Sequence, residues 1–146
     1  MKKDVLISIQ GLQHYSGSDE DNMELVTKGE LESIGDSLRL SYEETELTGM
    51  EGTTTLFHVE PERVTLLRTG TVSSEMVFEA GKRHMSVYDT PYGNMEIGIT
   101  ASKLNSTLTG NGGKLEIDYD IEINHKLAGK SLVRIDVREP GAGARA

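Results

Sequence analysis

The sequence contains no cysteine, which excludes disulfide bonds, thiol-based catalysis and zinc sites with cysteine ligands. Basic residues are scarce: 15 Lys and Arg stand against 24 Asp and Glu. The resulting net charge of −9 argues against a nucleic-acid partner and against an anionic membrane surface. Long hydrophobic runs are also lacking, and the run Val5–Ile9 is too short for the apolar part of a signal peptide. We therefore expect a cytoplasmic protein with no nucleic-acid or membrane partner.

The length of 146 residues is that of one domain, and apolar residues make up 36% of the chain, enough for a hydrophobic core. The last residues are rich in glycine and alanine. We expect residues 1–138 to form the domain and residues 139–146 to form a flexible C-terminal tail.

Apolar and polar residues alternate along most of the chain, which is typical of β-strands with one buried face. The clearest case is 115–124, where Leu, Ile and Tyr alternate with Glu, Asp and Asn. No window shows the apolar stripe of an amphipathic helix. The pattern predicts strands at about 3–11, 23–32, 37–46, 53–59, 62–69, 73–79, 82–90, 94–109, 113–124 and 130–138.

The loops of the first half predict how neighbouring strands pair. Antiparallel pairing across Leu47–Gly52, across Pro61 and across Gly70 puts apolar side chains opposite one another. A turn at Ala80-Gly81 continues the same pattern. The expected pairs are Leu40 with Phe57, Phe57 with Leu66, Leu66 with Met76, Val64 with Phe78, and Met76 with Met85.

Three further turns predict the pairing of the second half. A three-residue loop at Pro91-Tyr92-Gly93, a type I′ turn at Asn111-Gly112 and a five-residue loop at His125–Gly129 each suit a hairpin. The expected pairs are Val87 with Ile97, Met85 with Ile99, Leu108 with Leu115, and Tyr119 with Ile135, with Asp118 and Asp120 on the outer face.

The apolar residues of the strand at 94–109 change from odd to even positions between Ala101 and Leu104. A β-bulge near Ser102-Lys103 would keep both sets on the same face. Consecutive strands then share one buried face and are antiparallel. A meander of this length is expected to curl and close. The sequence therefore predicts an all-β, single-domain antiparallel meander that forms a barrel of about ten strands.

Five segments are distinctive: Tyr42-Glu43-Glu44, Leu47–Thr55, Met76–Glu79, Tyr88–Gly93 and Gly113–Tyr119. In these segments the sequence resembles the YwiB-like family of bacterial proteins of unknown function. The resemblance covers nearly the whole chain except the tail. It implies a calycin-type β-barrel like that of lipocalins and fatty-acid-binding proteins, in a bacterial cytoplasm. It assigns no catalytic or binding residue.

The predicted pairing gathers polar side chains on the inward face at one mouth of the barrel. An inward arginine must be paired, and two carboxylates lie within its expected reach. In one interpretation the guanidinium of Arg68 holds the carboxylate or phosphate of a ligand. In the other, a network of ion pairs closes the end of the barrel. The candidate ligand-binding residues are Tyr42, Glu44, Thr55, Arg68, Ser74 and Asp89.

Two functions fit these features. The first is a binding protein that holds a small, anionic ligand inside the barrel. The second is a protein-interaction or assembly module whose filled barrel takes no ligand. An interior cavity of roughly several hundred Å3 would favour the first. The second depends on inward side chains that fill a small barrel, which are Met23, Met76, Met85, Met95, Phe57 and Phe78.

Catalytic and metal-binding patterns are not found. The four histidines have no metal-ligand spacing, and we expect His14 and His125 in loops and His58 and His84 on the outer face. We expect no catalytic residue, no cofactor and no metal, and a monomer or a homodimer.

Overall fold

A computed structural model describes residues 2–15, 20–45, 50–71, 73–90 and 93–139. Within the strands, the side chains of residues 13–15, 20–22 and 88–90 lie outside this description. Most of the expected C-terminal tail, from residue 140 onward, also lies outside it.

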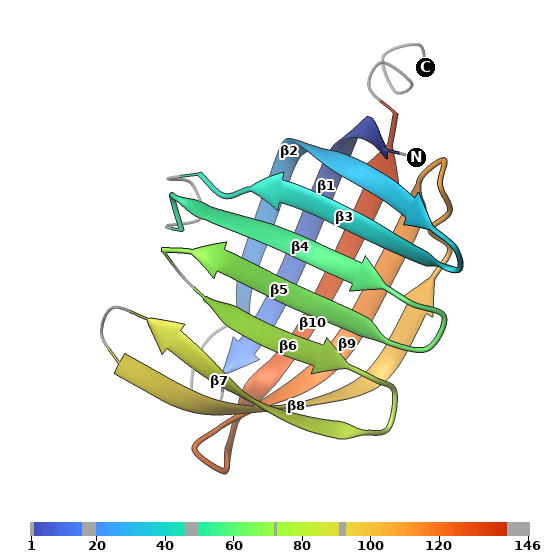
Figure 1. Cartoon of the computed structure of the whole chain (residues 1–146). Helices are drawn as coiled ribbons and strands as arrows, with labels where there is room; N and C mark the ends of the chain where they lie inside the picture. The colour runs from blue at the N-terminus through green and yellow to red at the C-terminus, as the bar shows by residue number, and fades with distance from the viewer. Residues whose placement is uncertain (1, 16–19, 46–49, 72, 91–92, 140–146) are drawn as a thin grey trace.

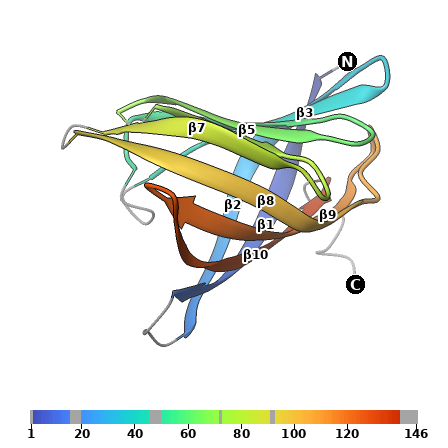
Figure 2. The same ribbon diagram turned by 90° about the horizontal axis from the view of Figure 1, so that it is seen from below.

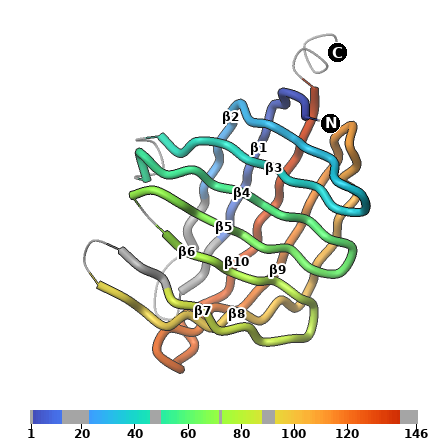
Figure 3. Tube along the Cα trace, viewed as in Figure 1, coloured from blue at the N-terminus to red at the C-terminus, as the bar shows by residue number. Residues whose placement is uncertain are grey.

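The described chain consists of ten β-strands, as the alternation of its residues predicts (Figures 1 and 3). Within these residues there is no helix with the length and apolar character that crossing a bilayer requires. The strands are β1 (Lys2–Tyr15), β2 (Glu20–Ile34), β3 (Ser37–Glu43), β4 (Thr53–Val59), β5 (Val64–Gly70), β6 (Ser74–Phe78), β7 (Arg83–Thr90), β8 (Gly93–Ser106), β9 (Gly113–Ile123) and β10 (Lys126–Arg138).

All ten strands belong to one antiparallel sheet, in the order β6-β5-β4-β3-β2-β1-β10-β9-β8-β7. The first and last strands of the chain pair side by side, with Ile9 opposite Ile135. The sheet curls into a nearly closed barrel whose two edges are β6 and β7 (Figures 1 and 2). We call the place where these two edges face each other the seam.

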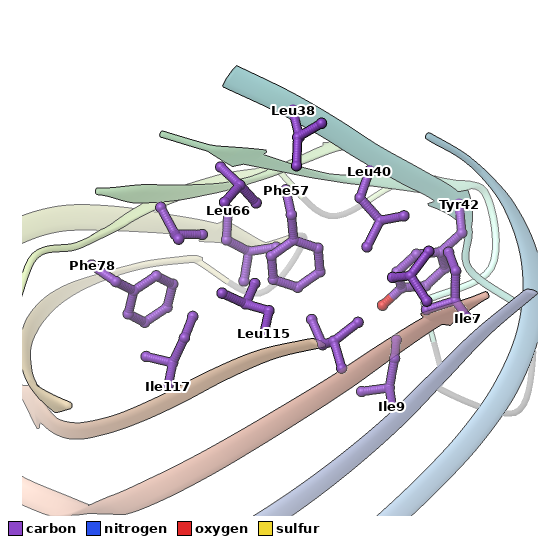
Figure 4. Close-up of a cluster of buried hydrophobic side chains, with 14 of the residues drawn as sticks. Ile7, Ile9, Leu38, Leu40, Tyr42, Phe57, Leu66, Phe78, Leu115 and Ile117 are labelled. Carbon is purple, nitrogen blue, oxygen red and sulfur yellow. The ribbon is translucent and has the colours of Figure 1, made fainter. Parts of the chain in front are cut away.

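The hydrophobic core lies inside the barrel because every second residue of each strand points inward. Side chains such as Ile7, Leu40, Phe57 and Ile117 are almost completely buried and meet inside the barrel (Figure 4). The rings of Phe78 and Tyr119 make an edge-to-face contact, with their centroids 4.8 Å apart. This contact joins β6 to β9 across the interior.

The predicted registers from β3 to β6 are confirmed. Leu40 lies opposite Phe57, and Phe57 opposite Leu66. Leu66 lies opposite Met76, and Val64 opposite Phe78. The predicted bulge is also confirmed, since the register of β8 against β9 shifts between Ala101 and Lys103.

The predicted registers around β9 are wrong, although the inward and outward faces are right. Leu115 lies opposite Ser106 instead of Leu108, because the chain turns at Gly110-Asn111, one residue earlier than predicted. A turn displaced by one residue changes each pairing by two positions, so parity is preserved. Asp118 and its neighbours therefore still face outward.

The hairpin between β9 and β10 also differs from its prediction. The chain turns at Asn124-His125, where both residues have positive φ, and a register shift follows between Leu127 and Gly129. Tyr119 consequently lies opposite Ser131 and not opposite Ile135. The displacement is again by an even number of residues, so the buried face is kept.

The predicted register of β7 is wrong by one residue, and this error reverses its faces. Thr90 lies opposite Gly93 and Ser86 opposite Ile97, so the loop has two residues instead of three. Met85 and Val87 are therefore exposed on the outer face.

The same change of face moves His84. It lies opposite the buried Ile99, on the inner face of the sheet and not on the outer face as predicted. Its Nε2 is 3.0 Å from Oε1 of Glu79, at the hairpin that begins the seam.

The reversed faces of β7 explain the seam. Among the described residues, one isolated bridge links the two strands, between Glu79 and Lys82 in the hairpin that joins β6 to β7. Extending that register would put the inward Met76 opposite the outward Met85, and an antiparallel pair must share a face. The predicted pair Met76–Met85 is therefore not formed, and the barrel stays open along the seam.

Candidate functional site

The barrel interior contains a cavity of about 420 Å3. Its walls come from opposite sides of the sheet and are mostly apolar, with Ile9 and Phe57 on one side and Ile99 and Ile117 on the other. The volume lies in the range of pockets that hold small molecules. The barrel is therefore not filled by its own side chains.

Arg68 is the one charged residue among the described residues that line this cavity. It lies near the end of β5, opposite Thr55 on β4 and Ser74 on β6. Its Nε is buried and has no hydrogen-bond partner in the described part of the chain. An N–H group in this position has lost its water and retains a donor for a group that enters the cavity.

Glu44 is buried and is hydrogen-bonded to Thr55, the residue that lies opposite Arg68. The Thr55 hydroxyl donates a hydrogen bond to Oε2 of Glu44, and both side chains are buried. Tyr42 lies opposite Thr55 and lines the cavity. Burial raises the pKa of Tyr42, and the negative charge of Glu44 adds to that rise, while the positive charge of Arg68 opposes it.

Tyr42, Glu44, Thr55 and Arg68 therefore form one cluster, which we call the Arg68 cluster. The row Tyr42–Thr55–Arg68 runs directly across β3, β4 and β5, as the sequence predicts. Tyr42 belongs at the same time to the buried core, where its ring lies among apolar side chains (Figure 4).

The two other predicted site residues, Ser74 and Asp89, are not part of the Arg68 cluster. Ser74 is buried and its hydroxyl has no hydrogen-bond partner among the described residues, but it is not part of the cavity lining. The side chain of Asp89 lies outside the description. Its expected inward position depended on Met85 and Val87, which are exposed. A salt bridge between Arg68 and Asp89 stays a prediction.

The sequence reasoning missed part of the cavity wall. Tyr119 and Ile121 of β9 and Gly11 of β1 line the cavity opposite the Arg68 cluster. The alternation of β9 already placed Tyr119 and Ile121 inside. What it could not supply was the distance across the barrel, which depends on the shear of the whole sheet.

The expected methionine filling of the barrel is only partly correct. Met76 packs against the core and Met23 lines the cavity although it is half exposed, whereas Met85 and Met95 are exposed. Met85 is outside because of the reversed faces of β7.

The acidic residues of β9 lie on the outer face, and three of the four have basic partners. Nζ of Lys103 is 2.9 Å from Oε1 of Glu116, and Nε of Arg134 is 3.1 Å from Oε2 of the same residue. The hydrogen bond from Lys103 lowers the pKa of Glu116. Lys130 and Arg83 similarly pair with Asp120 and Glu122. Within the described residues, no group of three or more His, Asp or Glu side chains is placed to hold a metal ion.

Comparisons with known proteins find one family and one similar fold. A family model with the description "Domain of unknown function (DUF1934)" matches residues 7–135. The crystal structure of the ywiB protein from Bacillus subtilis is similar, with a TM-score of 0.79, 18% sequence identity and coverage of 92% of each chain. At this identity the likeness shows the fold alone. No curated protein matches the sequence.

Proposed function

Because this chain belongs to the DUF1934 family, a domain of unknown function, we propose from its own geometry that it binds a small anionic molecule inside the barrel. The ligand has an apolar body and one anionic end. The observation that carries this proposal is the cavity of about 420 Å3, apolar except for two tyrosines and Arg68.

The chemistry of the wall supports an amphipathic ligand. Apolar side chains stabilise an apolar body by removing its surface from water. The buried Nε of Arg68 has no partner among the described residues, so a carboxylate, phosphate or sulfate oxygen can accept its hydrogen. Hydrogen bonds between charged groups are shorter and stronger than those between neutral groups. Arg68 would thus fix which end of the ligand enters first.

A second candidate function is a protein-interaction module. Met85 and Val87 are exposed on β7, a sheet edge with unpaired backbone groups over most of its described length. Exposed edges of this kind accept strands from partner proteins. The cavity favours the ligand, since an assembly module gains nothing from an empty, largely apolar interior.

The test compares one anionic and one neutral probe with the same ten-carbon body. We expect decanoate to bind the native protein more tightly than decanol in isothermal titration calorimetry below the micellar range. Arg68→Gln should weaken decanoate binding by about tenfold or more, to the level of decanol, because a charged hydrogen bond is lost.

Arg39→Gln is the matched control, because Arg39 is exposed on the outer face of β3 and its loss changes net charge equally. It should leave decanoate binding unchanged. Native mass spectrometry of protein purified from its own host should also detect a retained small molecule. Equal decanoate affinity in both variants, or no binding by the native protein, would contradict the proposal.

A further inference from the structure

We infer that the cavity accepts a ligand with a single negative charge and rejects one with two, because Glu44 is part of the same buried cluster as Arg68. This inference rests on the proposed function and adds the charge of the ligand to it.

The first step is the balance of charge in the cluster. Arg68 supplies one positive charge, and it is the one cation on the described cavity wall. Glu44 supplies one negative charge and is 5% exposed. The charges of both residues act on the hydroxyl of Tyr42, which places them at the same end of the barrel. The empty cluster is therefore neutral overall.

Glu44 and Arg68 differ in whether their hydrogen-bonding groups already have partners. Glu44 accepts hydrogen bonds from the Thr55 hydroxyl and from the hydroxyl of Tyr42. Those bonds do not use the buried Nε of Arg68, which has no hydrogen-bond partner within the described chain. Arg68 thus receives long-range electrostatic support from Glu44 and keeps a donor for a ligand.

The third step is the effect of a ligand charge. A ligand with one negative charge accepts a charge-assisted hydrogen bond from Arg68, and the loaded cluster then has a net charge of −1. A second negative charge has no further cation on the described wall and adds repulsion from Glu44. Charges in a poorly solvated site are weakly screened, so this repulsion is larger than it would be at the surface.

The experiment uses three probes with the same unbranched ten-carbon body: decanoate, decyl sulfate and decyl phosphate. Decyl sulfate and decyl phosphate both have tetrahedral heads of nearly equal size, so the comparison separates charge from shape. At pH 8 the sulfate carries one charge and the phosphate carries nearly two, since the second phosphate pKa is about 6. Affinities are measured by calorimetry below the micellar range.

We expect the native protein to bind decyl sulfate about tenfold more tightly than decyl phosphate. Glu44→Gln should bring the two affinities within about threefold of each other, mainly by strengthening phosphate binding. Glu43→Gln is the matched control, because this neighbouring residue is exposed and faces outward. It removes the same charge and should leave the tenfold difference in place.

The outcomes separate this inference from the proposed function. If the native protein binds decyl sulfate and decyl phosphate equally well, the inference is wrong and the proposed function stands. Binding of none of the three probes would instead overturn the proposed function. The native comparison decides the matter even if Glu44→Gln fails to fold, and thermal unfolding of each variant identifies that case.

Discussion

Tyr42 illustrates how the barrel sets the properties of one side chain. Its ring packs in the core, and its hydroxyl lies near both charged members of the Arg68 cluster. Burial is the largest influence and opposes ionisation, because a phenolate would be poorly solvated there. The native protein therefore holds the Tyr42 proton more tightly than the unfolded chain does.

This difference predicts a loss of stability at alkaline pH. The unfolded chain begins to release the Tyr42 proton near the ordinary pKa of 10.0, whereas the native protein still retains it. Below pH 10 the full stability is present, and it is lost progressively as the pH rises above 10. Each pH unit in that window costs about 1.4 kcal/mol.

Urea denaturation at pH 9 and at pH 11 measures the effect. We expect the free energy of unfolding to fall by roughly 1 kcal/mol more in the native protein than in Tyr42→Phe, which has no proton to lose there. Other tyrosines and the lysines contribute equally to both proteins. An identical fall in the two proteins would refute the raised pKa of Tyr42.

At the scale of elements, the β9–β10 hairpin turns on two residues that glycine would suit better. Asn124 has φ of 51° and His125 has φ of 70°. Positive φ at both positions is the geometry of a type I′ turn, which favours Asn-Gly. Both residues tolerate this conformation better than most, but any residue with a Cβ is less favoured there than glycine.

We therefore expect His125→Gly to stabilise the protein by about 0.5–1 kcal/mol. The ion pair of His125 with Glu96, at 3.0 Å, is exposed and adds little. Urea denaturation at pH 8 measures the gain. His125→Val should act in the opposite direction, since a β-branched residue is still more strained at positive φ. A lower stability for the glycine variant would argue against this turn geometry.

The accuracy of the predicted registers depends on the turns. Between β3 and β6, loops with glycine or proline lie close to the centres of their hairpins, so the row Tyr42–Thr55–Arg68 could be predicted. At Asn111-Gly112 the favoured turn sequence lies beside the actual turn, because Gly112 and Gly113 are used for a close approach of the backbone instead. A Cβ at Gly113 would stand 2.4 Å from the carbonyl oxygen of Thr107.

The prediction failed where a single residue decides the face of a strand. The loop after Thr90 has two residues, and its assignment as three residues reversed β7 and removed the support for Asp89. Alternation could not reveal this error, because it favours the wrong face: Met85 and Val87 alternate with the polar Ser86, yet both are exposed. The cavity itself was beyond the sequence, since its size depends on the curvature of the whole sheet.

At the scale of the whole molecule, the barrel is held together by pairing between the beginning and the end of the chain. β1 and β10 form a continuous ladder from Leu6–Arg138 to Tyr15–Gly129. Nζ of Lys3 also lies 3.1 Å from Oε1 of Glu139. The weak point is the seam, where one described bridge links two strands that are neighbours in sequence.

The seam has a consequence for how the chain folds. The spatial order of strands, started at β7, is that of a meander that begins at Gly81, passes through joined ends between β10 and β1, and finishes at Ala80. A circular permutant cut there would convert the most distant pairing, β1 with β10, into a local hairpin. Low contact order speeds folding. We expect this permutant to refold faster than the native chain, and stopped-flow tyrosine fluorescence measures the rates.

A permutant cut between Glu60 and Pro61 should not refold faster than the Gly81 permutant, because it makes the ladder of β4 with β5 a distant one. A Gly81 permutant that refolds no faster than the native chain would mean that the closing of β1 on β10 does not limit folding.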